Sequence, residues 1–240
     1  MATGGGAVNE FKDAIDFIFH SRESVTGGVQ IGGSEILTLM WKHLELSFAA
    51  LAIACAFAVP VGLWLGHIRR GSFVAISVSN IGRAVPTLAL IAFFIAYFGV
   101  GFANVMFALT LLAIPPILTN TYVGVTQVDP DTVDAARGVG MTGAQVVRKV
   151  ELPLALPIMF GGIRVSAVNV VATATIAPLA GVVTLGNPII NAQVYGSAGR
   201  LGGAIVVALL AIAADAAFGL LQRAVTPRAL RVTNRRTETA

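Results

Sequence analysis

A polar stretch in the middle of the chain combines residue types that suit contact with another protein. An acid, two small residues and a base follow one another in Asp134-Ala135-Ala136-Arg137, and Gly140 comes three residues later. Small side chains let a partner approach closely, and the charges around them offer polar contacts. Charges are costly inside a membrane. We therefore expect this stretch to face water as a docking surface.

Capping residues predict a first short helix in this stretch. Asp131 can cap a helix that begins at Thr132, and Asp134 lies where a negative charge suits the positive end of the helix dipole. Either Gly138 or Gly140 can end this helix, because glycine tolerates the backbone conformation that follows a last turn. The helix would lead into a glycine-rich elbow.

A second short helix is predicted after the elbow. Thr142 and Gln145 have the spacing of a capping box, in which each side chain bonds to the backbone of the other residue. We expect the helix to run through Glu151 and to be terminated by Pro153 and Pro157, because proline cannot donate a backbone hydrogen bond. The two short helices would then form a protruding surface that a partner protein can bind.

Groups for catalysis or metal binding are sparse in the sequence. No Gly-Lys pair occurs, so the phosphate-binding loop of nucleotide hydrolases is missing. His20, His43 and His67 are isolated from one another, and we interpret each as an interfacial side chain. Cys55 is the only cysteine, which excludes a disulfide within the chain. The sequence predicts a protein that is not an enzyme and holds no metal or cofactor.

One acid, Asp215, lies deep in an apolar run. A charge in hydrocarbon is costly, so this carboxylate is either functional or paired with a donor in the helix bundle. Glu45 lies at the mouth of a span and can reach water. A secondary carrier or channel is a second hypothesis, although such carriers need more intramembrane ion sites than these. Transport by the purified chain alone under an ion gradient would favour it.

The elements that must position these residues are membrane helices. The 240 residues are 56% hydrophobic and 12% charged, with a mean hydropathy of +0.82, whereas globular domains carry about 25% charge. A span needs about 20 apolar residues. The sequence predicts an all-α integral membrane protein with five spans, near 44–66, 81–99, 104–125, 162–182 and 202–222. The basic residues flank spans and do not alternate with aromatics, so we do not expect nucleic-acid binding.

Lysine and arginine predict the orientation. Five spans would place residues 67–83, 126–164 and 223–240 on one side, with twelve basic residues against four on the other. Positive residues accumulate in the cytoplasm. The N-terminus is therefore expected outside and the C-terminus inside. The twelve are Arg69, Arg70, Arg83, Arg137, Arg148, Lys149, Arg164, Arg223, Arg228, Arg231, Arg235 and Arg236.

The organisation expected along the chain has three parts. Residues 1–43 form an extracytoplasmic segment, with an interfacial helix at 9–20 and a flexible glycine-rich link at 26–33. Residues 44–222 form one transmembrane domain, whose polar loop spans 126–161. Residues 223–240 form a basic cytoplasmic tail.

The loop pattern resembles the signature of permease subunits of type I binding-protein-dependent ABC importers. The matching residues are Asp134, Ala135, Ala136, Gly140, Val150, Leu152 and Pro153, with Asp and Val in place of the usual Glu and Ile. The resemblance covers most of 44–230 and is closest to the permeases for glycine betaine, choline and related osmoprotectants. Segments that carry this closer likeness are Ala84–Leu90, Gly162–Arg164, Leu220–Arg223 and Thr226–Arg228.

The resemblance implies a transport subunit of the inner (cytoplasmic) membrane, surrounded by lipid, that imports an osmoprotectant such as glycine betaine, choline or proline betaine. Its partners would be a cytoplasmic ATPase dimer that binds ATP and magnesium, an extracytoplasmic substrate-binding protein and a second permease chain. An amino acid or another small solute is the alternative substrate. The implied ATPase contacts are Asp134, Ala135, Ala136, Arg137, Gly140, Val150, Leu152 and Pro153. We expect Pro86, Thr87, Asn169, Thr173, Thr175 and Asp215 as candidates for the translocation path, although the small residues of the fourth span suit helix packing better.

Overall fold

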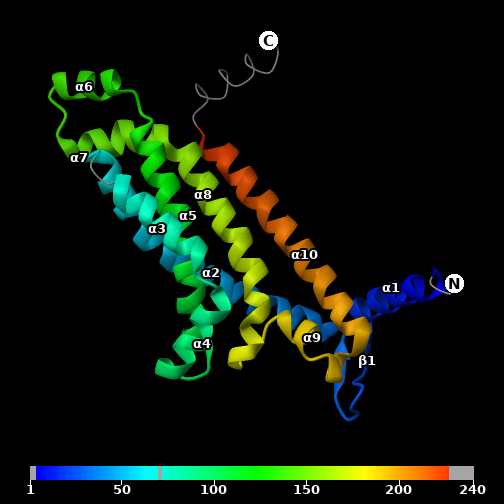
Figure 1. Ribbon diagram of the computed structural model, residues 1–240. Helices are drawn as coiled ribbons and strands as arrows, with labels where there is room; N and C mark the ends of the chain where they lie inside the picture. The colour runs from blue at the N-terminus through cyan, green and yellow to red at the C-terminus, as the bar shows by residue number, and fades with distance from the viewer. Residues whose placement is uncertain (1–3, 70–71, 227–240) are drawn as a thin grey trace. The chain divides into compact units, whose positions relative to one another are not determined.

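Helices make up nearly all of the computed structural model, which describes residues 4–69 and 72–226 (Figure 1). Arg70 and the tail residues Arg228, Arg231, Arg235 and Arg236, which the orientation count uses, lie outside this range. The elements in chain order are α1 (Gly4–Phe19), β1 (Ser21–Glu23), β2 (Gln30–Gly32), α2 (Ser34–His67), α3 (Ser72–Ala84), α4 (Thr87–Phe98), α5 (Phe102–Thr126), α6 (Pro130–Gly138), α7 (Gly143–Val146), the π-helical turn η1 (Val147–Glu151), α8 (Leu152–Thr173), the 3₁₀ segment η2 (Ala174–Ala180), α9 (Gly186–Ile190) and α10 (Ala192–Val225).

Four helical segments among the described residues are long and apolar enough to cross a membrane. They are α2, α5, the run Gly143–Ala180 and α10, and the shorter α4 is apolar as well. The all-α membrane class is confirmed. The number of five spans and the orientation stay predictions.

The second predicted span, 81–99, is not one helix. α3 ends at Ala84 and α4 begins at Thr87, with Pro86 at the extended φ of −65° and ψ of 125°. Proline disfavours the helical conformation in the residue before it, so Val85 leaves the helix. The break therefore falls at Pro86, inside the predicted span.

The chain divides into two compact units, and the first comprises Met1–Leu51, Pro86–Thr110 and Val168–Ala213. Its core joins the N-terminal residues Phe17 and Ile31 to Leu185, Tyr195 and Val207. The prediction of a flexible link at 26–33 is wrong. β1 and β2 pair antiparallel there, with Arg22 opposite Ile31, because burial of Ile31 in this core fixes the hairpin. The helix before it is longer than expected, since α1 already starts at Gly4.

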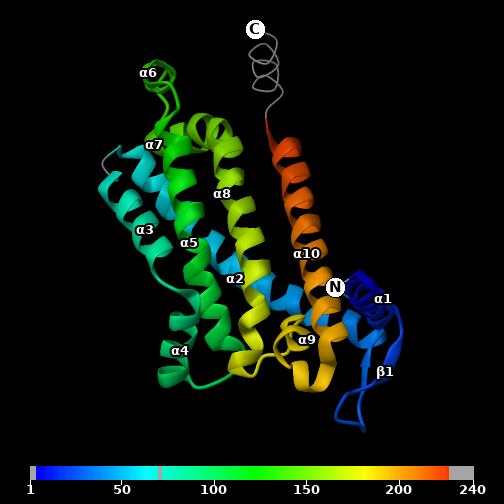
Figure 2. The same cartoon turned by 45° about the vertical axis from the view of Figure 1, so that its right-hand side comes forward.

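The second unit comprises Ala52–Val85, Leu111–Ala167 and Ala214–Ala240. Small residues set its helix contacts. A Cβ at Gly62 would lie 2.7 Å from the Thr121 Cβ, so α2 packs directly on α5. Ser166 donates a hydrogen bond of 2.8 Å from α8 to the carbonyl of Ala113 on α5. Figures 1 and 2 both show α6 beyond the ends of α5 and α8 in this unit. The helices thus hold the polar loop at their ends.

Candidate functional site

The polar loop, residues 126–161, begins with a firmly capped α6. Asp129 is the N-cap, and its Oδ1 accepts a 3.0 Å hydrogen bond from the backbone N–H of Asp131. Pro130 occupies the first helical position, where its missing N–H costs nothing. The prediction that Asp131 caps a helix starting at Thr132 is therefore wrong by two residues, because the proline extends the helix toward the N-terminus.

Gly140 ends α6, which decides between the two glycines that the sequence left open. Its φ is +88°, a conformation that favours glycine. The N–H of Gly140 donates to the carbonyl of Arg137 at 2.9 Å, and the N–H of Met141 donates to the carbonyl of Ala136 at 3.2 Å. This pair of bonds is the Schellman arrangement, which satisfies the last carbonyls of a helix. The elbow after α6 thus has a defined geometry.

The capping box predicted at the start of α7 is confirmed. The Thr142 backbone N–H donates to Gln145 Oε1 at 2.8 Å, and the Gln145 N–H donates to Thr142 Oγ1 at 3.4 Å. The predicted stop at Pro153 and Pro157 is wrong, because helical structure continues through η1 and α8. In η1 the N–H of Leu152 reaches back five residues to Val147, and this shift of register just before Pro153 accommodates a residue without an N–H.

A small apolar cluster of its own holds the loop together. Val128, Val133, Ala136 and Val146 are buried in it. Of the predicted contact residues, Asp134, Ala135, Arg137 and Gly140 are exposed, and Ala136 is 8% exposed. The other three, Val150, Leu152 and Pro153, are partly buried. The side chain of Ala136 therefore packs inside the loop, while the other small and charged residues of α6 form its outer face.

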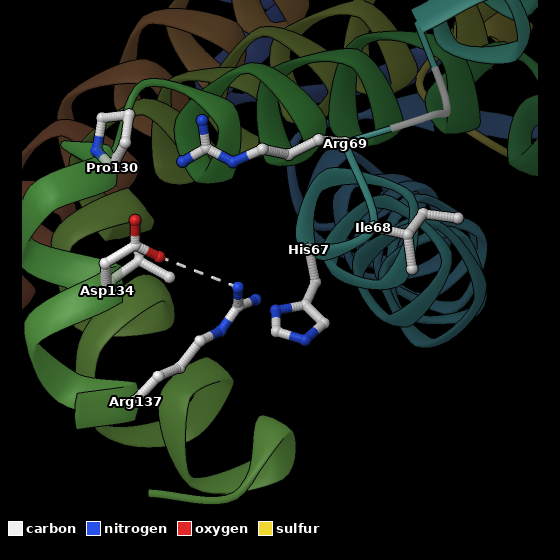
Figure 3. A pocket seen from close by; sticks show the side chains of 7 residues that line it. His67, Ile68, Arg69, Pro130, Asp134 and Arg137 are labelled. Atoms are coloured by element: carbon white, nitrogen blue, oxygen red, sulfur yellow. Dashed lines mark ion pairs between the residues drawn. The ribbon is translucent and has the colours of Figure 1, made fainter. Parts of the chain in front are cut away.

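A pocket of about 310 Å³ lies between α6 and the end of α2. Figure 3 shows His67 and Arg69 reaching into it from one side and Asp134 and Arg137 from the other. Asp134 and Arg137 form a loose ion pair of 3.9 Å on the same helix. Arg69 donates to the carbonyl of Val128 at 3.0 Å, which attaches the end of α2 to the start of the loop.

The closest polar contact of this site joins His67 to Glu151. Imidazole Nδ1 donates to Glu151 Oε2 at 2.7 Å, and Glu151 is 1% exposed. Residue spacing does not indicate this pair, because 84 positions separate its members. The interfacial interpretation is wrong for His43, since that residue is 0% exposed and bonds to the carbonyl of Val171 at 2.8 Å. His20 is exposed directly after the end of α1 and pairs with Asp16, so its interfacial position stays a prediction.

The candidate path residues belong to both units. Pro86 and Asn169 are exposed in the first unit, and Thr87, Thr173 and Thr175 are partly buried there. Asp215 belongs to the second unit, where it pairs with Arg164. Glu45 pairs with Lys42 at 3.0 Å on α2. The alternative of a paired Asp215, which the sequence left open, is therefore the observed one.

Comparisons with known proteins cover most of the chain. The family described as "Binding-protein-dependent transport system inner membrane component" matches residues 58–231. The chain belongs to this family of permeases. It is 39% identical to the carnitine transport permease protein OpuCB of Listeria monocytogenes, over 84% of this chain and 93% of that one. It is 37% identical to the glycine betaine/carnitine/choline transport system permease protein OpuCB of Bacillus subtilis, over 84% and 94% of the two chains.

The fold agrees with that membership. An inward-facing structure of the MetNI methionine ABC transporter matches the permease with a TM-score of 0.70 at 23% identity, over 80% of this chain and 96% of the other. The family match includes the whole polar loop. The permease is thus a multi-pass transport subunit of the inner membrane rather than an enzyme.

Proposed function

We propose that this permease imports a small osmoprotectant such as glycine betaine, choline or proline betaine. The observation that carries the proposal is the 39% and 37% identity, over most of both chains, to relatives named for carnitine, glycine betaine and choline. These solutes share a quaternary ammonium group, which donates no hydrogen bonds. Aromatic faces can hold this cationic group, and hydroxyl and amide side chains can hydrogen-bond to the carboxylate or hydroxyl that the same solutes carry.

The polar loop is the proposed contact with a separate ATPase dimer. α6 is exposed on one face, capped at both ends and stiffened by its own apolar cluster. A rigid, water-facing helix can transmit force, whereas a loose loop would absorb it. Asp134, Ala135, Arg137 and Gly140 would form the contact, and Ala136, Val150, Leu152 and Pro153 would support it from inside the loop. Closure of the ATPase on ATP would then move α7 and the helical run that follows it.

The translocation path is proposed to lie beside the polar residues of the first unit. Asn169 is exposed on α8, and Thr173 and Thr175 follow at its end with partly accessible side chains. Pro86 and Thr87 begin α4 next to a break in the helix. These groups would accept the solute from a binding protein outside, and a second permease chain would complete the path.

Reconstitution tests the proposal. The permease, its ATPase and its binding protein are placed in liposomes, and ATP-driven uptake of radiolabelled glycine betaine and choline is compared with uptake of methionine and histidine. We expect uptake of the quaternary amines only, and only with ATP and the binding protein present. Uptake of the amino acids alone would overturn the substrate assignment. Uptake under an ion gradient without ATPase would support the carrier hypothesis instead.

A further inference from the structure

Two polar contacts join α8 to α10 within the second unit. Arg164 donates from Nε to Asp215 Oδ1 and from Nη2 to Asp215 Oδ2, each at 2.6 Å. Gln222 Nε2 donates to the carbonyl of Pro157 at 2.7 Å. On α8 the second contact lies seven residues before the first, and on α10 it lies seven residues after the first. Seven residues are two helical turns, about 10.5 Å. The two contacts therefore hold antiparallel helices at two levels.

The geometry at the first contact fixes an orientation as well as a distance. A guanidinium that meets a carboxylate with two parallel hydrogen bonds is held in one plane. Gly219 gives it room, since a Cβ there would lie 3.4 Å from Arg164 Cζ and Nη1. An apolar pair would cost less in a membrane helix but would not restrict the plane of the two side chains as two parallel hydrogen bonds do. The ion pair therefore fixes the relative orientation of the Arg164 and Asp215 side chains, which apolar packing alone does not.

Apolar packing buries side chains mainly in the first half of α10, where Tyr195, Ala198 and Val207 lie. Only 6% of its most apolar 18-residue window is buried in the chain, compared with 50% for α5. The side chains of Arg164 and Asp215 are 39% and 44% exposed. After Val207 no described residue of α10 is buried, so the two polar contacts to α8 are important for holding this half of the helix.

We propose that Arg164, Asp215 and Gln222 form a clamp that makes the end of α10 follow α8 during transport. The proposal rests on the proposed docking of the polar loop. Helical structure runs without a break from Gly143 at the loop into α8. A displacement of α7 is therefore carried along this run to Pro157 and Arg164, and the clamp passes it to α10. These are positioning residues, which need not touch the solute.

The test is the amount of solute taken up per ATP hydrolysed in liposomes that hold the complete importer. Asp215→Asn removes one charge at constant size, and Arg164→Gln removes the other charge with a shorter side chain. We expect uptake to fall by at least about tenfold, as for loss of a charge-assisted hydrogen bond, while ATP hydrolysis continues. The reversed pair Arg164→Asp with Asp215→Arg keeps both charges and should recover most of the uptake. Lys42→Ala, which breaks an exposed pair within one helix, is the matched control and should change nothing.

The possible failures separate from one another. If the unaltered importer shows no ATP-driven uptake, the proposed function is wrong and the clamp falls with it. If the unaltered importer shows ATP-driven uptake and Asp215→Asn takes up the same amount of solute per ATP hydrolysed, only the clamp is wrong. Single variants that do not reach the membrane leave the reversed pair as the test. Normal coupling by the reversed pair supports the clamp, and uncoupled hydrolysis by a well-inserted reversed pair overturns it.

Discussion

Replacement of His67 by alanine should loosen the attachment of the polar loop to α2. Glu151 would stay buried while losing the imidazole that now lies 2.7 Å from its carboxylate. Removing one member of a fully buried pair costs about 3–5 kcal/mol. The His67 side chain is 21% exposed, so water can replace part of the contact. We therefore expect His67→Ala to destabilise the attachment of the loop by about 1.5–3 kcal/mol, the range for hydrogen bonds to charged groups.

Hydrogen exchange followed by mass spectrometry measures this loss locally. A change of about 1.4 kcal/mol alters an equilibrium constant tenfold. Local opening of Val147–Glu151 should therefore become roughly 10 to 150 times more frequent, and the exchange rate of its backbone amides should rise by the same factor. His67→Gln keeps a donor and should restore much of the protection. His20→Ala removes a histidine from an exposed pair with Asp16 at the end of α1 and serves as the control. Unchanged exchange in His67→Ala would refute the idea that this pair attaches the loop.

Three further changes test the packing and the loop, each with a partner variant. Gly162→Ala would place a Cβ 2.6 Å from two atoms of α5, so it should cost about 1–3 kcal/mol of stability, measured by thermal unfolding. The Cβ of Gly161→Ala would have its nearest atom 3.9 Å away, so this control should be tolerated. Gly140→Ala meets no atom within 4 Å but must hold a φ of +88°, so it should cost about 1–2 kcal/mol of stability and reduce ATP-driven uptake. Gly138→Ala also meets no atom within 4 Å and needs no such φ, so it should lower neither stability nor uptake. Thr142→Ala removes the N-cap and should destabilise the start of α7 by about 1 kcal/mol, measured by the hydrogen exchange of its backbone amides. Thr142→Ser keeps a capping hydroxyl and should not. Equal behaviour within any pair would contradict the corresponding contact.

Local signals in the sequence predicted the parts of the fold that depend on neighbouring residues. Long apolar runs gave the membrane helices, and the spacing of Thr142 and Gln145 gave the capping box. The cap of α6 was misplaced because Asp131 competes with Asp129, and the decisive feature is Pro130 between them. The continuation through Pro153 depends on a π-helical turn, which residue spacing does not signal.

Contacts between distant positions were beyond sequence analysis. His67 and Glu151 are 84 positions apart, and Arg164 and Asp215 are 51 apart. Each member has an ordinary local interpretation, so periodicity and spacing do not pair them. The burial of Ala136 was missed for a similar reason, because its neighbours Val128 and Val146 come from either side of α6. Sequence therefore located the candidate site, and the structure defined which of its residues face outward.

Cross-linking from α6 tests the central claim that the polar loop contacts the ATPase. A single cysteine is introduced as Ala135→Cys in a Cys55→Ser background, and a short bifunctional reagent is added to the complete importer with and without ATP. The account predicts a cross-link to the ATPase whose yield changes with ATP. Val25→Cys, exposed in the β-hairpin of the first unit, should give none. A cross-link from Val25→Cys together with none from Ala135→Cys would contradict both the docking site and the orientation.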